Sequence, residues 1–162
     1  GDVYKRQDMG VLDNWGDGTI TRDVIDTMVG EHGRGGRHHG GGFYEYGEDG
    51  SKAIWPGLMD LYFKADASVA EDDMKDRLLF RQVIEALKCL ETNVLRTVAD
   101  GNIGSIMGIG APAWTGGLIQ FVNTYGLERF SARCAELANQ YGDRFDAPAI
   151  VGEKIAAGET FA

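Results

Sequence analysis

The sequence predicts an all-α protein, and three features of its 162 residues lead to that class. Between Asp76 and Val98, apolar side chains recur at three- and four-residue steps, the spacing of one face of a long helix. Three apolar segments farther along the chain stop at or near glycines, which commonly end helices. Extended structure is expected only in a short hairpin-like stretch over residues 43–56, which is too short to form a sheet.

The N-terminal third is expected to hold little regular structure. Residues 1–7, GDVYKRQ, are interpreted as a remnant of cloning or of sequence assembly, and residues 8–18 as a turn or loop. Thr21 is expected to cap a short helix that Gly30 and Gly33 end. The apolar face of that helix is predicted to consist of Val24, Ile25, Met28 and Val29.

Residues 33–42 contain six glycines beside basic and histidine side chains, which predicts a surface loop. His32, His38 and His39 are the only histidines of the chain, and Glu31 and Glu45 lie nearby in the sequence. A metal site would need three or four ligands held rigidly, which a polyglycine loop does not provide. We therefore expect no metal-binding residues here.

The next segment combines an aromatic anchor with a turn and a long helix. Phe43, Tyr44 and Tyr46 form the anchor, and residues 48–51 are expected to make the turn. Ser68 and Glu71 fit a capping box at the start of the long helix, the central helix of the domain. Its buried stripe is predicted to contain Leu79, Val83, Ile84, Leu87, Leu90, Val94 and Val98.

The segment Asp100–Gly117, DGNIGSIMGIGAPAWTGG, holds six glycines and one proline, which predicts that a helix ends there in a tight turn. Gly108, Gly110 and Ala113 also fit the G-x-G-x-x-A pattern of a dinucleotide site. That site follows a strand, whereas the residues upstream are helical and Pro112 interrupts the turn. We therefore expect Gly108 and Gly110 to serve a helix stop and a close backbone approach.

Three more helices are expected, at residues 118–124, 128–141 and 148–157, with Gly142 and Gly158 ending the last two. Asp146 is the expected N-cap of the last helix. Large or weakly polar side chains are expected to be packed; these are Trp55, Trp114 and the reduced thiols Cys89 and Cys134.

Charge and hydropathy restrict the possible partners and compartments. A net charge of −9 disfavours nucleic acid and anionic membranes as partners, since neither attracts an acidic surface. No apolar run approaches the ~18 residues of a membrane span, and the first residues lack the apolar core of a signal peptide. A cytoplasmic location is the resulting expectation.

Catalytic groups are not apparent. The carboxylates Asp72, Asp73 and Asp76 at the start of the long helix are expected to complement its dipole, and no feature separates the pKa values of a catalytic pair such as Glu85 and Glu91. Ser105 has neither an adjacent histidine nor a G-x-S-x-G elbow. We expect no catalytic, cofactor-binding or metal-binding residue in this chain.

Three quoted segments resemble one known family. RLLFRQVIEALKCLETNVL (Arg77–Leu95), DGNIGSIMGIGAPAWTGG and FVNTYGLERFSARCAELANQYGDRF (Phe121–Phe145) are similar to the C-terminal domain of 3-hydroxyacyl-CoA dehydrogenase, above all that of the multifunctional fatty-acid oxidation α subunit. Upstream, GRGGRHHGGGFYEY (Gly33–Tyr46) and IWPGL (Ile54–Leu58) resemble the end of a first tandem copy. The resemblance implies that residues 8–66 are the end of a first helical copy plus a linker, and that residues 67–162 are the second helical C-terminal domain.

The resemblance implies a helical fold like the C-terminal domain of 6-phosphogluconate dehydrogenase and a role in NAD-dependent oxidation of 3-hydroxyacyl-CoA during fatty-acid β-oxidation. The family places its Rossmann domain, hydratase domain and catalytic His–Glu pair upstream, so this chain is expected to be inactive alone. It would cap the acyl-CoA cleft and pack against domains or subunits, including a thiolase subunit or a second copy. The alternative is a free-standing helical interaction module; a start codon near Met9 would support it, whereas an upstream reading frame that encodes a Rossmann domain would support the enzyme fragment.

Overall fold

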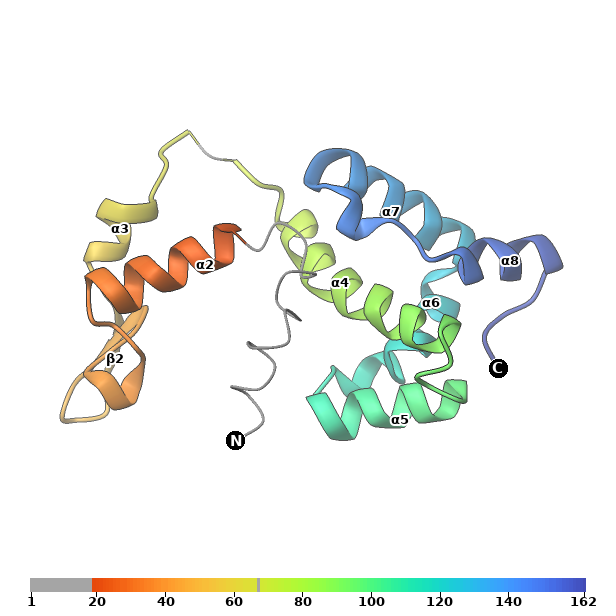
Figure 1. The fold of residues 1–162 in the computed structure, drawn as a ribbon, viewed down its shortest axis with the longest axis horizontal. Helices are drawn as coiled ribbons and strands as arrows, with labels where there is room; N and C mark the ends of the chain where they lie inside the picture. The colour runs from red at the N-terminus through yellow and green to blue at the C-terminus, as the bar shows by residue number, and fades with distance from the viewer. Residues whose placement is uncertain (1–18, 67) are drawn as a thin grey trace. The chain divides into compact units, whose positions relative to one another are not determined.

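The computed structural model describes residues 19–66 and 68–162 (Figure 1). The chain divides into two units, Gly1–Ala67 and Ser68–Ala162. Helices predominate in the described part, which has a single two-stranded sheet and confirms the all-α class. The interpretations of residues 1–7 and 8–18 concern residues outside the described ranges.

The first unit begins its described part with helix α2, Thr19–Ile25, which continues into the π-helical segment η2, Asp26–Glu31. Thr21 lies within α2, so its predicted capping role is wrong. Gly33, with φ +65°, turns the chain away from the helix end as expected, whereas Gly30 lies inside η2 and does not end the helix. Only part of the predicted apolar face is covered, because Met28 is buried whereas Ile25 and Val29 are exposed.

The glycine-rich loop is at the surface as predicted, but its backbone is held by specific bonds. Gly36 and Gly41 form an antiparallel bridge around the 3₁₀ turn η3, Arg37–His39. The Arg34 Nε donates to the Gly42 carbonyl at 2.7 Å, and its guanidinium lies 4.3 Å from the centre of the Trp55 ring. A single well-placed arginine therefore gives order to a segment whose composition indicates flexibility.

Strands β1, Tyr44–Tyr46, and β2, Lys52–Ile54, pair as an antiparallel hairpin, so the expectation that this stretch is too short for a sheet is wrong. The turn is where it was predicted, and Asp49 Oδ1 accepts a bond from the Ser51 N–H at 2.9 Å. Lys52 Nζ lies 3.8 Å from the centre of the Tyr44 ring, a cation–π contact that supports the pairing. A short helix α3, Gly57–Tyr62, follows.

The second unit is a bundle of five helices joined by two 3₁₀ turns. The elements are α4 (Glu71–Glu91), α5 (Val98–Ile109), η4 (Ala113–Thr115), α6 (Leu118–Tyr125), α7 (Leu127–Tyr141), η5 (Asp143–Phe145) and α8 (Ala149–Ala157). Their shared core includes Phe80, Val83, Ile84, Leu87, Ile119, Val122, Phe130, Cys134, Leu137 and Val151, all fully enclosed. The central helix and the burial of its Leu87 are thereby confirmed.

The long helix ends earlier than the apolar spacing predicts. Its last residue is Glu91, and Asn93 adopts a left-handed conformation with φ 58° that stops it. A new helix, α5, starts at Val98, where the Thr97 side chain accepts from the Asp100 N–H at 3.0 Å. Val94, predicted to be buried, therefore lies in the connection and is exposed.

Two further predicted N-caps, Ser68 and Asp146, are wrong, although the predicted helix ends at Gly142 and Gly158 are confirmed. Ala70, not Ser68, precedes α4, and no side chain caps that helix. Pro148, not Asp146, precedes α8, and the N–H of Ile150 in the first turn of α8 donates to Glu91 Oε1 at 2.9 Å. The cap of α8 thus comes from the far end of α4, a pairing that local sequence does not reveal.

Candidate interaction surface

The turn between α5 and α6 forms where the glycine pattern predicts it. The close contact between two backbone segments, however, occurs at a different glycine from those predicted. Gly110, with φ +70°, ends α5, and the Ala111 N–H bonds to the Ser105 carbonyl at 2.9 Å. Space around Gly108 and Gly110 is open, so neither makes the predicted backbone contact. Gly117, with φ +111°, makes it instead, because a Cβ there would overlap the Cα of Asn102.

Three polar side chains cap the start of α6. Asn102 Oδ1 accepts from the N–H groups of Ile119 and Gln120 at 3.1 and 2.8 Å. Ser105 Oγ accepts from Leu118 at 3.2 Å, and Thr115 Oγ1 accepts from Gly117 at 3.1 Å. These N–H groups are the ones that a phosphate would use at a helix N-terminus. In the structure these N–H groups bond to side chains of the same unit, and the element before the turn is the helix α5 rather than a strand.

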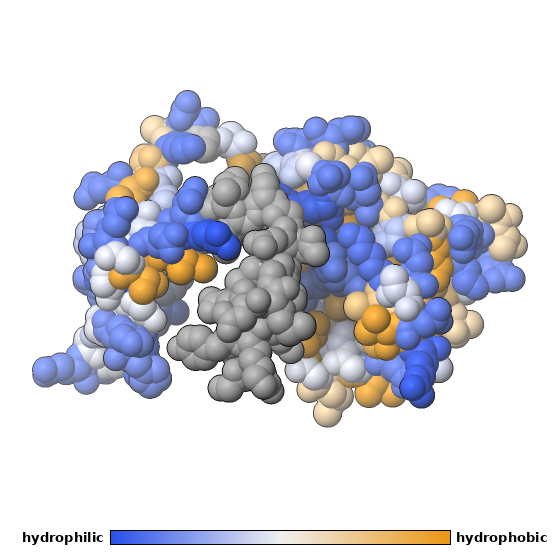
Figure 2. Space-filling view, viewed as in Figure 1, coloured by the Kyte–Doolittle hydropathy of each residue, from blue (hydrophilic) through white to orange (hydrophobic). Residues whose placement is uncertain are grey.

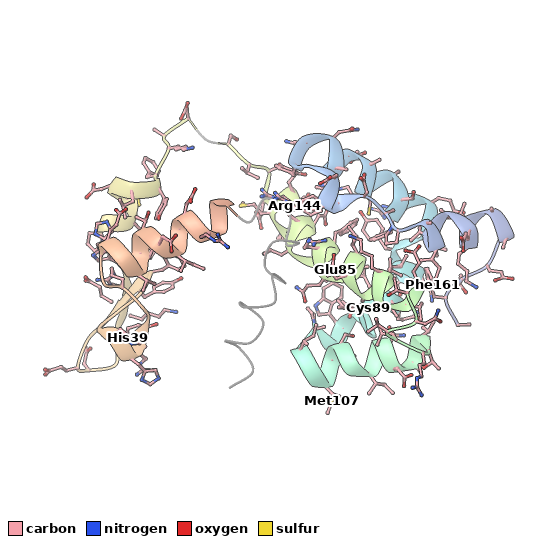
Figure 3. The ribbon with its side chains drawn as sticks, in the orientation of Figure 1. His39, Glu85, Cys89, Met107, Arg144 and Phe161 are labelled. Carbon is pink, nitrogen blue, oxygen red and sulfur yellow. The ribbon has the colours of Figure 1, made fainter. Side chains whose placement is uncertain are left out.

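The outer side of α5 exposes large apolar side chains. Met107 is 82 % exposed and projects away from the other helices of its unit (Figure 3), and Ile103 is 64 % exposed on the turn of helix before it. Ile109, the last residue of α5, is 68 % exposed, and Trp114 in η4 is 75 % exposed although its ring packs against Phe121. The prediction that Trp114 fills a packing gap is wrong. We call Ile103 and Met107, which lie one turn apart on the outer side of α5, together with Trp114 the α5 face; Ile109 lies on another side of the helix.

Glycines accompany the large residues of the α5 face. Gly104 and Gly108 are exposed, lie one position after Ile103 and Met107, and would have nothing within 4 Å of an added Cβ. Ile103 and Met107 are four residues apart, and so are Gly104 and Gly108. Each of these two pairs therefore forms a row along the helix. Figure 2 shows apolar residues reaching the surface at the lower edge of this unit, where α5 lies.

Charge is missing from the same segment. No Asp, Glu, Lys or Arg occurs between Asp100 and Glu128, although 25 % of the chain is charged. Depletion of charge together with exposed aromatic residues and methionine is typical of the centre of a protein interface. The α5 face therefore has the composition of a contact surface.

Most ionisable groups of the second unit stabilise its structure. Arg133 on α7 binds Asp73 at 2.5 Å and Asp76 at 2.7 Å, both on α4. The Tyr141 hydroxyl also donates to Asp73, so Arg133 first and Tyr141 second lower the pKa of that carboxyl. The acids expected to complement the helix dipole therefore also join two helices. Their partner on α7 was missed, because no local spacing connects them.

The other candidate groups, Cys134, Glu85 and His32, take part in packing or in ion pairs at the surface. Burial, assisted by Asp146, raises the pKa of the Cys134 thiol to about 12, which keeps it protonated and unreactive. Glu85 pairs with Arg81 and Lys88 on its own helix, and Figure 3 shows it at the surface of α4. His32 meets the edge of Trp55, with ring centres 5.3 Å apart. Among the described residues, no three His, Cys, Asp or Glu side chains gather as a metal site.

A groove of about 330 Å³ lies within the first unit, between α2 and the glycine-rich loop. Its walls are mainly apolar, with Met28, Val29 and Phe43 among them. Arg34 is the single charged lining residue, and it is engaged with the carbonyls of Gly42 and Tyr44. The groove thus offers mainly apolar contact, and its one charged lining residue is bonded to the protein's own backbone.

No protein-family model matches the chain. In the described ranges, no helix has the length and apolar character that crossing a bilayer requires.

Proposed function

We propose that Ser68–Ala162 is the helical packing domain of an NAD-dependent 3-hydroxyacyl-CoA dehydrogenase of fatty-acid β-oxidation, inactive by itself. The proposal rests on the resemblance of Arg77–Leu95, Asp100–Gly117 and Phe121–Phe145 to that family, in the family's order. NAD, acyl-CoA and the upstream Rossmann and hydratase domains belong to the parent enzyme in this proposal. The proposal also includes a fold like that of the C-terminal domain of 6-phosphogluconate dehydrogenase.

The α5 face is the observation that supports a packing role most directly. A bundle that has enclosed sixteen hydrophobic residues in one core nevertheless leaves Met107 and Trp114 largely in solvent. Exposed apolar surface free of charge is costly in water, and another protein surface removes that cost. The face would therefore contact another domain or subunit of the enzyme, where it helps to enclose the acyl-CoA cleft.

The experiment joins the chain to the Rossmann portion of a 3-hydroxyacyl-CoA dehydrogenase and follows NADH formation from 3-hydroxybutyryl-CoA. We expect the joined protein to oxidise substrate much faster than the Rossmann portion, and the 162-residue chain alone to show neither turnover nor micromolar NAD binding. Turnover by the chain alone, or no gain on joining, contradicts the proposal.

A pair of matched variants connects the activity to the α5 face. Met107→Glu places a charge in the face and should lower kcat/KM of the joined protein by about tenfold or more, which is ~1.4 kcal/mol of transition-state stabilisation. Leu78→Glu is the control, because Leu78 on α4 is similarly exposed, at 73 %. Equal effects of the two variants would remove the special role of the α5 face.

A further inference from the structure

We propose that residues 159–162 are a releasable strap, and that the site they occupy recognises an extended peptide segment with an acidic residue two positions before a phenylalanine. The strap follows α8, and Gly158, with φ +67°, reverses the chain between them. Figure 1 shows the chain turning back after α8 toward the other helices of its unit. The occupant of the site in this structure is the strap itself, with the sequence Glu-Thr-Phe-Ala.

The first part of the site is a pocket for one aromatic ring. Phe161 is 3 % exposed and belongs to the hydrophobic core, whereas Glu159, Thr160 and Ala162 are exposed. The strap forms no helix or strand, so a single buried side chain anchors it in the bundle. Segments with few buried apolar contacts open at a lower free energy than the core of a domain. We therefore expect the strap to leave its site while the helices of the second unit stay folded.

The second part of the site is the side-chain amide of Asn123 on α6. Its Oδ1 accepts from the Phe161 N–H at 3.0 Å, and its Nδ2 donates to the Phe161 carbonyl at 2.7 Å. Nδ2 also donates to Gln120 Oε1 at 3.1 Å, which fixes the orientation of the amide. Opposite residues of an antiparallel strand pair exchange two bonds in the same way. The amide thus recognises the backbone of an extended segment, while the pocket beside it selects the aromatic ring.

The third part of the site is Lys154, in the last turn of α8. Its Nζ lies 2.7 Å from Glu159 Oε2, and its side chain is 30 % exposed, against 61 % for Glu159. The ammonium group lowers the pKa of the Glu159 carboxyl through this bond. Lys154 therefore favours an acidic residue two positions before the phenylalanine.

A peptide added to the full chain tests the site. Phe161→Ala empties the pocket, so the acetylated peptide Gly-Glu-Thr-Phe-Ala should bind this variant with a dissociation constant of about 10–500 µM. The parent chain, whose strap fills the site, should bind the peptide at least about tenfold more weakly. Fluorescence anisotropy of the labelled peptide measures both affinities. A Phe161→Ala chain that does not bind the peptide, or a parent chain that binds it equally well, overturns the proposal.

Two controls separate recognition from non-specific apolar contact. The peptide Gly-Glu-Thr-Ala-Ala, which lacks the ring, should not bind Phe161→Ala. Phe145→Ala removes another phenylalanine that is 3 % exposed, from η5, and leaves the strap in its site. This variant should melt at a lower temperature without gaining affinity for the peptide. Binding of the ring-free peptide to Phe161→Ala, or of Gly-Glu-Thr-Phe-Ala to Phe145→Ala, contradicts a specific site.

The polar contacts of the site have their own test in the Phe161→Ala background. Asn123→Asp keeps an acceptor for the peptide N–H but sets a negative charge against the peptide carbonyl, so affinity should fall at least about tenfold. Lys154→Met should lower affinity only about two- to fivefold, because the ion pair with the acidic residue is partly exposed. Unchanged affinity in Asn123→Asp contradicts recognition of the peptide backbone.

Amide hydrogen exchange of the parent chain tests release of the strap without any substitution. The Phe161 N–H should exchange at least about 100-fold faster than that of Leu87 in α4, because the strap opens without unfolding of the bundle. Equal protection of the two amides would mean that the strap leaves its site only on global unfolding, which overturns its release. None of these measurements uses enzyme activity, so this site and the proposed enzyme role are decided separately.

Discussion

Different interactions stabilise the two units of this chain internally. In the described part of the first unit, Met28 is the only large hydrophobic residue that is buried, whereas the second unit encloses sixteen hydrophobic residues in one cluster. The first unit is ordered by backbone bridges and by Arg34, which bonds to two carbonyls and covers Trp55. Polar contacts can fix a local shape, but burial of apolar area supplies most of the free energy of folding.

Among the residues that the structure describes, those of the second unit form the core of an independent domain, and those of the first unit do not. The apolar residues of the second unit come from α4, α6, α7 and α8 and meet in a single cluster. In the first unit, by contrast, Ile25, Phe43 and Ile54 remain at least half exposed beside a mainly apolar groove. The described part of the first unit thus leaves large apolar side chains in contact with solvent.

The largest expected effect tests this contrast directly. Leu87→Ala should lower the free energy of unfolding by about 2–5 kcal/mol, because Leu87 is fully enclosed and its truncation leaves a cavity. Met28→Ala in the first unit should leave the main denaturant transition at its midpoint. Urea titrations followed by circular dichroism give both values. A large shift with Met28→Ala, or none with Leu87→Ala, would break the comparison.

The next effect concerns backbone contact in the second unit. Gly117→Ala should cost about 2–3 kcal/mol, since the residue has φ +111° and an added Cβ would overlap the Asn102 backbone. Asn102 could not move away easily, because its side chain caps α6. Thermal unfolding measures the loss. A variant as stable as the parent chain would mean that α5 and α6 separate without penalty.

Local patterns in the sequence predicted most of the second unit and less of the first. Helical spacing found the buried face of α4, and glycines marked the ends of α5, α7 and α8. The break at Asn93 was missed because apolar spacing continues through Val94, while the left-handed residue interrupts the helix. Apolar periodicity reports which residues favour a helix, and it does not report where the backbone turns.

Contacts between distant residues account for the other errors. The cap of α8 by Glu91, the cap of α6 by Asn102 and the ion pairs of Arg133 each join separate elements. The α5 face itself was missed for a related reason. Ile103, Met107 and Trp114 have the composition of core residues, and only the packed bundle shows that they stay outside. The charge-free segment was the signal that could have indicated a contact surface.

A smaller pair of effects tests the turn at the end of α5. Gly110→Ala should lower stability by about 1 kcal/mol, because Gly110 needs φ +70° although its surroundings are open. Gly108→Ala should raise stability by up to about 1 kcal/mol, because Gly108 is helical and exposed. Melting curves at low protein concentration, with and without NAD or CoA, decide between structure and ligand binding. Changes that appear only with ligand would assign the turn to a phosphate.

The smallest expected effect is the acid sensitivity that Arg133 gives to the second unit. Arg133 and Tyr141 hold the pKa of Asp73 below its ordinary value, so the ionised carboxylate stabilises the folded state above that ordinary value. This stabilisation should disappear as the pH falls from the ordinary aspartate pKa of about 4 toward the lower folded-state value.

Arg133→Met removes the main cause of the pKa shift of Asp73. The stability of this variant should therefore decline less steeply over that pH range, although the variant should be less stable at pH 7. Urea midpoints measured between about pH 2 and 7 report the slope for both proteins, and Lys154→Met, which removes the exposed partner of Glu159, serves as a control for an ion pair outside the α4–α7 contact. Parallel pH profiles for the parent chain and Arg133→Met would mean that these ion pairs contribute nothing to joining α4 and α7, and that apolar burial alone distinguishes the second unit from the first.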